Sequence, residues 1–284
     1  MQNRDWYNQQ YLPSLTVANT GDIVADWEHR SAATRAKYPF IADIKYGSHP
    51  REVIDLFRLA NAKATLIYIH GGYWRSFSKV ETSFVADSFL EQGVSVALIN
   101  YPLCPEVSIE DIRSSIQNAF AYLYKNVLTE DERISIVVTG HSAGGHLAAL
   151  HLATDWKVFG LPENPIAGVV ALSGVFDVEP LIQTDLNEVL QITKTSAAIL
   201  NLNTAHVRSN SKLVFAVGAD EPEEFHRQSR DQAKAWAKLG PQIINLPNTN
   251  HFTIVDSLSQ PQGVLHMLSI HLLHAQKHAA KKAP

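Results

Sequence analysis

The sequence predicts an α/β fold in which a mostly parallel central sheet of about eight strands is covered by helices on both faces. Two observations lead to this prediction. Short apolar segments rich in β-branched residues alternate with longer helical segments, as parallel strands joined by crossover helices require. A glycine-flanked serine, Ser142, stands between one such strand and one such helix. The 284 residues contain no internal repeat and no long linker, so we expect a single domain over residues 1–284.

Eight strands and five helices are expected in this sheet and its crossovers. The expected strands are Ile41–Tyr46, Val53–Leu59, Leu66–Ile69, Val94–Ile99, Ile134–Val138, Val169–Leu172, Leu213–Val217 and Gln242–Leu246. We expect the first two to form an antiparallel edge. The expected helices are Lys79–Glu91, Ile109–Asn126, Ala143–Ala153, Phe225–Leu239 and Gly263–His274. In such a sheet, functional residues gather at the carboxyl ends of the strands.

Gly140-His141-Ser142-Ala143-Gly144 is a Gly-x-Ser-x-Gly pentapeptide, the pattern of a nucleophile elbow. A β-branched strand precedes it, and a helix rich in small residues follows it. Such a turn forces the serine into an unfavourable backbone conformation, and the flanking glycines let the strand and the helix approach each other closely. We therefore expect Ser142 to be a catalytic nucleophile.

A second segment, His70-Gly71-Gly72-Tyr73-Trp74, directly follows an expected strand and is predicted to form an oxyanion hole. The tetrahedral intermediate of acyl transfer carries a negatively charged oxygen, which preorganised backbone N–H groups stabilise. We expect donors from Gly72 and Tyr73, with Gly71 as a substitute, and from Ala143 after the nucleophile. Alone, the segment would be interpreted as a glycine turn after a strand. The neighbouring elbow motif favours the oxyanion hole.

A general base and an acid complete the expected site. Among thirteen histidines, His251 is the expected base, because it lies in a polar loop after the last expected strand. The acid should end a strand between Ser142 and His251, where Asp220 and Glu221 are adjacent and either could orient the imidazole. The chain order serine, acid, histidine is one of the known orders of such triads.

Two segments do not fit the core and could cover the site. Residues 1–38, the N-terminal covering segment, carry several aromatic side chains that would pack onto the core edge or line a pocket. Residues 174–210 are a helix-rich insertion between the strand before Ser142 and the strand before the expected acid. That position lets the insertion reach the pocket mouth as a lid.

Composition excludes several other classes of function. A formal net charge of -4 and a pI near 6.3 provide no electrostatic footprint for nucleic acid. Neither a signal core nor an apolar run of roughly 20 residues is present, so no membrane partner is expected. One cysteine, Cys104, rules out an intrachain disulfide and fits the cytoplasm. His274 and His278 have a metal-like spacing without a supporting motif, so neither a metal nor an organic cofactor is expected.

The chain resembles the α/β-hydrolases of the hormone-sensitive-lipase-like group and, within it, the arylformamidases (kynurenine formamidases). The resemblance covers most of the chain from about residue 40, and its motifs lie in residues 70–74, 101–106, 140–147 and 217–229. It implies the α/β-hydrolase fold. The family's spacing implies Glu221 as the triad acid with Asp220 in reserve, and a Glu stands where the family has Asp.

The resemblance implies that the chain cleaves a formyl group from an arylamide such as N-formylkynurenine, a reaction of tryptophan catabolism. Ser142, His251 and Glu221 would form the triad, and Tyr73 and Trp74 would offer the aryl ring a stacking surface. The same machinery would serve a short-acyl carboxylesterase. A ligand-binding receptor on a hydrolase scaffold is a third function, although such proteins commonly lose a triad member. A small-molecule acyl substrate is the expected partner, and the motifs leave open whether the chain forms a homodimer.

Overall fold

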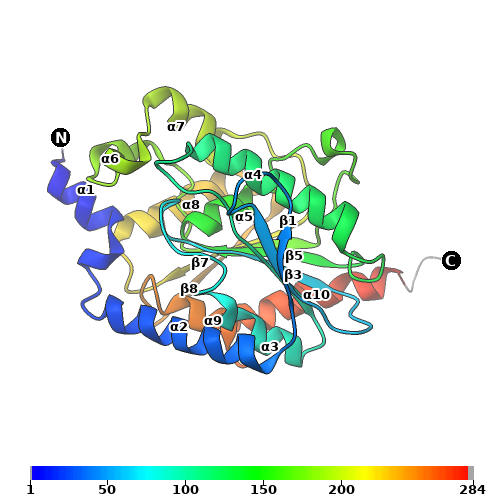
Figure 1. Cartoon of the computed structure of the whole chain (residues 1–284). Coiled ribbons are helices and arrows are strands. Elements are labelled where there is room, and N and C mark those ends of the chain that lie inside the picture. The colour runs from blue at the N-terminus through cyan, green and yellow to red at the C-terminus, as the bar shows by residue number, and fades with distance from the viewer. Residues whose placement is uncertain (1, 281–284) are drawn as a thin grey trace.

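The computed structural model describes residues 2–280, so the first residue and the last four of the predicted 1–284 domain lie outside it. One eight-stranded sheet runs through the molecule, with helices on both faces (Figure 1). The strands are β1 (Ile41–Lys45), β2 (Val53–Phe57), β3 (Thr65–Ile69), β4 (Ser95–Ile99), β5 (Ile136–His141), β6 (Gly168–Leu172), β7 (Lys212–Gly218) and β8 (Gln242–Leu246). The α-helices are α1 (Arg4–Tyr11), α2 (Thr20–Lys37), α3 (Ala86–Glu91), α4 (Ile109–Tyr122), α5 (Ala143–Leu150), α6 (Asn187–Leu190), α7 (Lys194–Leu200), α8 (Glu223–Ala235), α9 (Ile254–Ser259) and α10 (Val264–Ala280).

The strand order is β1-β2-β4-β3-β5-β6-β7-β8. β1 pairs antiparallel with β2, β2 pairs antiparallel with β4, and every other pair is parallel. The eight predicted strands and the antiparallel edge are therefore confirmed. β3 and β5 are neighbours, so the loop after β3 and the turn after β5 meet at the same edge of the sheet.

The core consists of two apolar layers, one on each face of the sheet. Alternation along β3 shows the division, because Leu66 and Tyr68 contact one layer whereas Ile67 and Ile69 contact the other. The first layer includes residues of α2, α3, α9 and α10, and the second includes residues of α4, α5 and α8. Figure 1 shows these two groups of helices on opposite sides of the strands. Both faces of β3, β4, β5 and β6 are thus buried, which explains their continuous apolar sequences, whereas the edge strand β8 is largely exposed.

The predicted helices exist with different ends. The segment predicted over 79–91 begins with a 3-10 turn at Ser83–Val85 and becomes α-helical only in α3. α4 ends at Tyr122, where a π-helical turn, Leu123–Val127, continues it. No helix was predicted in residues 1–38, yet α1 and α2 form there. Of the α2 residues only Trp27, Ser31 and Thr34 are buried, so its sequence shows little apolar periodicity.

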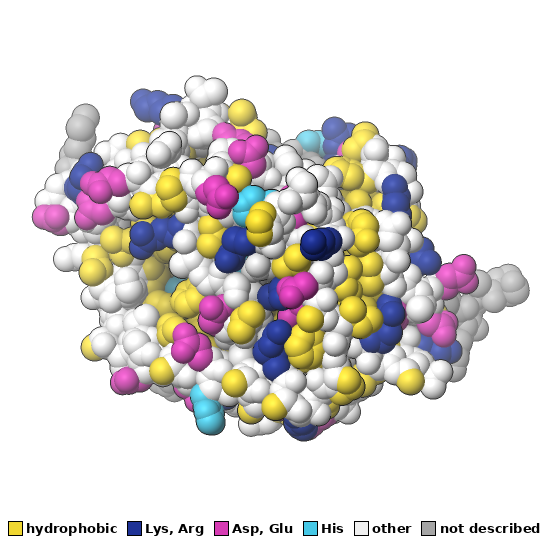
Figure 2. Space-filling model, in the orientation of Figure 1, with side chains coloured by type: hydrophobic (Ala, Val, Ile, Leu, Met, Phe, Trp, Pro, Cys, Tyr) yellow, Lys and Arg dark blue, Asp and Glu magenta, His cyan; other side chains and the backbone are white. Residues whose placement is uncertain are grey.

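The face of the molecule shown in Figure 2 carries basic and acidic side chains interspersed with each other and with small apolar areas. It shows no broad patch of one charge. Within residues 2–280, the helices lack the combination of length and hydropathy that a bilayer span requires.

Candidate active site

Ser142 lies on a sharp turn between β5 and α5, with φ 58° and ψ -120°. This conformation is unfavourable for a residue with a side chain, and close packing on both sides maintains it. A Cβ atom on Gly144 would lie 2.0 Å from the carbonyl oxygen of Ile69, and one on Gly140 would lie 2.2 Å from the Gly144 oxygen. The turn therefore requires both glycines of the pentapeptide. The Ser142 N–H donates to the Leu172 carbonyl at 2.8 Å.

The structure brings His251 and Glu221 together. His251 Nδ1 lies 2.7 Å from Glu221 Oε2, and both side chains are almost fully buried. The other carboxylate oxygen, Oε1, accepts hydrogen bonds of 2.6 Å from the Ser173 hydroxyl and from the Gly218 N–H. These bonds hold the carboxylate in one orientation. Because Nδ1 faces the carboxylate, Nε2 remains as the ring nitrogen that can exchange a proton with a bound group.

Asp220, the alternative acid, does not reach the histidine. Its residue is exposed, and its backbone N–H donates to the Thr249 carbonyl at 3.0 Å. Glu221 follows it and turns inward toward His251. The loop after β7 thus orients two adjacent carboxylates in different directions, and only Glu221 contacts the expected base.

The loop after β3 has an unusual backbone, with positive φ values of 97° at Gly72, 49° at Tyr73 and 55° at Trp74. The N–H groups of Arg75 and Ser76 both donate to the Gly72 carbonyl at 3.0 Å and close the loop. Within residues 2–280, the backbone N–H groups of Gly72 and Tyr73 have no hydrogen-bond acceptor. Unpaired donors of this kind can bind an oxyanion.

Gly71 and Ala143 flank the serine. A Cβ atom on Gly71 would lie 3.2 Å from Ser142 Cβ and 2.8 Å from the His141 carbonyl oxygen, so this glycine permits the close approach of the two loops. Neither Gly71 nor Ala143 belongs to the cavity lining described below. Ala143 begins α5, and among the described residues its N–H also lacks an acceptor.

Ser142 and His251 line one cavity of about 180 Å³. Its walls are mainly apolar and aromatic, and they come from the N-terminal segment, the loop after β3, the turn after β5, the insertion and the loop after β8. The lining residues are Leu12, Pro13, Ser14, Thr20, Trp27, Gly72, Tyr73, Arg75, Ser76, Phe77, His141, Ser142, Leu186, His251 and Phe252. The N-terminal segment contributes five of these residues, whereas the insertion contributes only Leu186.

The prediction that Trp74 lines the substrate pocket is wrong. Trp74 is fully buried in the core, its ring lies edge-on to His146 with 5.5 Å between ring centroids, and it is absent from the cavity lining. The backbone reversal at Gly72–Trp74 places consecutive side chains on opposite sides, so Tyr73 lines the cavity and Trp74 packs beneath it. The cavity walls instead include Phe77 and Phe252, for which the sequence carries no motif.

Trp27 both packs onto the core and lines the cavity, so neither alternative considered for the N-terminal aromatic residues was complete. It is 2% exposed and lies 6.2 Å from Phe77 and from Phe252, measured between ring centroids. It also meets His141 edge-on at 6.1 Å. The aromatic composition of residues 1–38 was the available signal, but the fold was needed to show where these side chains meet.

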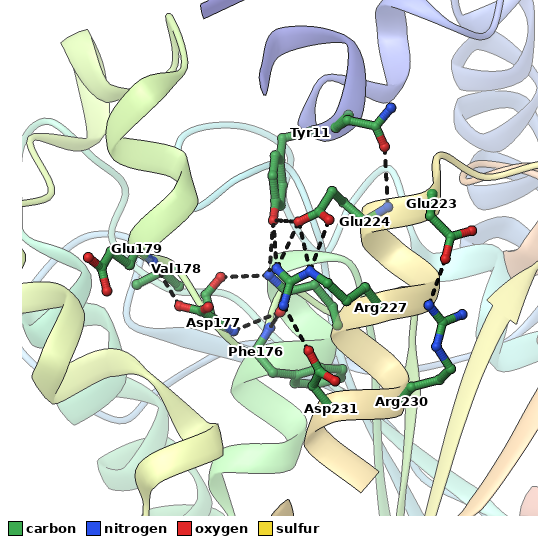
Figure 3. Close-up of polar contacts among 12 residues, drawn as sticks. Tyr11, Phe176, Asp177, Val178, Glu179, Glu223, Glu224, Arg227, Arg230 and Asp231 are labelled. Carbon is green, nitrogen blue, oxygen red and sulfur yellow. Dashed lines mark hydrogen bonds and ion pairs between the residues drawn. The ribbon is translucent and has the colours of Figure 1, made fainter. Parts of the chain in front are cut away.

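A partly buried polar cluster attaches the N-terminal segment to the rest of the molecule (Figure 3). The Tyr11 hydroxyl donates to Glu224 on α8, and Arg227 donates to the same carboxylate at 2.8 Å. On the same helix α1, Asn8 donates to Asp185 of the insertion at 2.7 Å. The Tyr73 hydroxyl donates to the Tyr11 carbonyl. The N-terminal segment is therefore bonded to α8, to the insertion and to the loop after β3.

Glu224 makes this attachment sensitive to pH. Burial alone would raise the pKa of Glu224, but hydrogen bonds from Arg227 and Tyr11 outweigh it and hold the pKa below its ordinary value of 4.5. A carboxyl group whose pKa falls on folding stabilises the protein above its unfolded pKa. That contribution disappears as the pH falls through the folded pKa.

We expect Glu224→Gln to lower the free energy of unfolding by about 1–3 kcal/mol near neutral pH, because Tyr11 and Arg227 lose a charged acceptor. The difference from wild type should shrink as the pH is lowered below about 4.5. Urea unfolding over a pH series measures it. Glu223→Gln is the matched control, since Glu223 is an exposed residue of α8 paired with Arg230. A difference that stays constant with pH would contradict the prediction.

Several histidines are buried and uncharged. Burial lowers the pKa of His70, His146 and His151 to about 4. Burial, together with the neighbouring His251, holds the pKa of His141 well below its ordinary value. A neutral His141 can donate its Nε2 proton to the His251 carbonyl at 2.6 Å, which ties the loop after β8 to the serine turn. Residues 2–280 contain no group of three or more His, Cys, Asp or Glu side chains that could hold a metal.

Comparison with known proteins agrees with this architecture. The profile of the BD-FAE family matches residues 54–218, more than half of the chain. Kynurenine formamidase of Salmo salar is 29% identical over 90% of this chain and 92% of its own length, and that of Danio rerio is 29% identical over 94% and 92%. These matches confirm the predicted resemblance.

Solved structures show the same fold. A crystal structure from Silicibacter sp. TM1040, provisionally described as a thioesterase, superposes with a TM-score of 0.81 at 29% identity and covers 90% of this chain and 95% of its own. Esterase B from Lactobacillus rhamnosis superposes with a TM-score of 0.66 at 18% identity, over 94% of this chain and 100% of its own. The predicted fold is confirmed. The chain belongs to the BD-FAE family and is a hydrolase of the α/β-hydrolase fold.

Proposed function

We propose that the chain is a serine hydrolase that cleaves a formyl group from an arylamide such as N-formylkynurenine through an acyl-enzyme. The observation that carries the proposal is the 2.7 Å contact between His251 and Glu221 beside a cavity that Ser142 and aromatic side chains line. The similarity to kynurenine formamidases of Salmo salar and Danio rerio over nine-tenths of the chain supports the formamide substrate.

In the first step, Ser142 Oγ attacks the formyl carbon while His251 Nε2 takes the serine proton. Glu221 accepts the Nδ1 hydrogen bond and stabilises the imidazolium that forms. The negative charge on the carbonyl oxygen is stabilised by the unpaired N–H groups of Gly72, Tyr73 and Ala143. We assign Gly71 a supporting role, the close approach of the two loops, rather than a donor role.

In the second step, the His251 imidazolium donates its proton to the amide nitrogen, the C–N bond breaks, and the arylamine leaves. The formyl group remains on Ser142 as an ester. Water attacks this ester, His251 takes its proton and returns it to Ser142, and formate is released. No step requires a metal or an organic cofactor.

The aromatic lining of the cavity supports an aromatic leaving group. Trp27, Tyr73, Phe77 and Phe252 all line it, and they replace the Trp74 surface that the sequence predicted. Aromatic rings bind another ring by stacked or edge-to-face contacts, which add to the free energy of burial. With N-formylkynurenine as substrate the reaction would belong to tryptophan catabolism, and the single buried cysteine, Cys104, agrees with a cytoplasmic location.

Comparison of substrates tests the proposal. We expect kcat/KM for N-formylkynurenine to exceed that for p-nitrophenyl acetate and butyrate, and Ser142→Ala to reduce all three activities to a small residual rate. Ester hydrolysis without formamide cleavage would instead identify a short-acyl carboxylesterase that uses the same triad. Failure of a fluorophosphonate to label wild-type Ser142 would favour a ligand-binding receptor on a hydrolase scaffold.

A further inference from the structure

We infer that Arg75 binds a carboxylate of the substrate, so that the enzyme selects anionic or zwitterionic arylamides over matched substrates without the carboxylate. The inference rests on the proposed function and adds the class of leaving group to it.

The charge of the cavity lining supports this inference. Arg75 is the one Lys or Arg in the lining, and the lining contains neither Asp nor Glu. An arginine keeps its charge at every physiological pH. The lining therefore presents a fixed positive charge without a carboxylate to balance it. An anionic group on the ligand would supply the balancing negative charge.

The Arg75 side chain is available for a ligand. Across residues 2–280, it forms neither an ion pair nor a hydrogen bond with its guanidinium. Most other arginines do, as Arg35 does with Asp55 at 2.7 Å and Arg58 with Glu132 at 3.0 Å. An unpaired guanidinium keeps its planar donors available for two parallel hydrogen bonds to a carboxylate.

The position of Arg75 also supports the inference. Arg75 lies on the loop that carries the expected oxyanion donors, and its N–H bonds to the Gly72 carbonyl at 3.0 Å. Because Arg75 is only two residues from Tyr73, one short loop would set the distance between the bound carboxylate and the polarised carbonyl. Binding at both points would orient the amide for attack by Ser142.

The remaining polar groups of the cavity agree with this assignment. Gly72 and Tyr73 belong to the lining, and within the described part of the chain their backbone N–H groups have no acceptor. The cavity thus offers unpaired donors and a positive charge. A complementary ligand brings acceptors and a negative charge.

The test compares N-formylkynurenine with its α-carboxamide, in which a neutral amide of nearly the same size replaces the charged carboxylate. We expect wild type to prefer the carboxylate, and Arg75→Ala to lower kcat/KM for the carboxylate roughly 10-fold more than for the carboxamide. This factor corresponds to the low end of the free-energy range for a hydrogen bond to a charged group, because Arg75 is exposed to solvent. The loss should appear mainly in KM, since the contact also exists in the ground state. Arg75→Lys should restore part of the preference.

Arg208→Ala is the matched control, because Arg208 is also exposed but lies outside the cavity lining. This substitution removes the same charge as Arg75→Ala. High salt should weaken the wild-type preference by screening. Equal kcat/KM for the two formamides in wild type, or an equal effect of Arg208→Ala and Arg75→Ala, would overturn the inference and leave the proposed function intact. Hydrolysis of p-nitrophenyl acetate without cleavage of either formamide would overturn the proposed function and, with it, this inference.

Discussion

Replacing Ser142 by Ala is expected to lower kcat for N-formylkynurenine by about 10⁵–10⁶-fold, the loss seen when a serine hydrolase lacks its nucleophile. Without Oγ no acyl-enzyme can form, so water would have to attack the bound amide directly. The unpaired N–H groups and the aromatic walls would remain and leave a small residual rate. Single-turnover measurement of formate release determines the loss.

The same variant should keep its fold. Ala143 and the glycines at 140 and 144, which the turn requires, are unchanged, so the free energy of unfolding should stay within about 1 kcal/mol of wild type. Covalent labelling by a fluorophosphonate should disappear in Ser142→Ala. If the variant keeps more than about a hundredth of the wild-type kcat, Ser142 is not the nucleophile.

Replacing Glu221 by Gln is expected to lower kcat by about 10³–10⁴-fold. Glu221 Oε2 lies 2.7 Å from His251 Nδ1, and its Oε1 accepts from Gly218 and Ser173. A glutamine cannot stabilise the imidazolium by charge. Its NH₂ group can also donate to Nδ1, which would place the ring proton on Nε2 and prevent the base from accepting the serine proton.

Asp220→Asn is the matched control for this prediction. Asp220 is the adjacent carboxylate, but it is exposed and does not contact His251, so kcat should change less than about 2-fold. The two variants lose the same charge at neighbouring positions. A large loss in Asp220→Asn with little loss in Glu221→Gln would reverse the assignment of the acid.

Much of the fold could be predicted because strands such as β5 and β6 are buried on both faces and have short, continuous apolar sequences. Helix ends were less predictable, since the change from α-helix to π-helix at Tyr122 leaves no periodic signal. α1 and α2 were missed for a related reason. Few of their residues are buried, so apolar periodicity was weak even though the Asn3 side chain caps α1.

The candidate site also has features that the sequence predicts and features that it does not. Local patterns were sufficient to single out Ser142 and the loop at 70–74, because a sharp turn and a close approach require glycines at particular positions. Adjacent residues with similar chemistry were harder to distinguish. Tyr73 and Trp74 differ in which side of the loop they occupy, and this depends on three consecutive positive φ values.

The amino-acid sequence thus determined the order of strands and helices, the nucleophile turn and the candidates for each role, since these depend on local composition and spacing. Tertiary structure decided that Glu221 rather than Asp220 meets His251, that Trp27 and Phe252 come together around the serine, and that Arg75 lies unpaired in the cavity lining. These results depend on contacts between segments distant in the chain, and only the packed sheet brings such segments together.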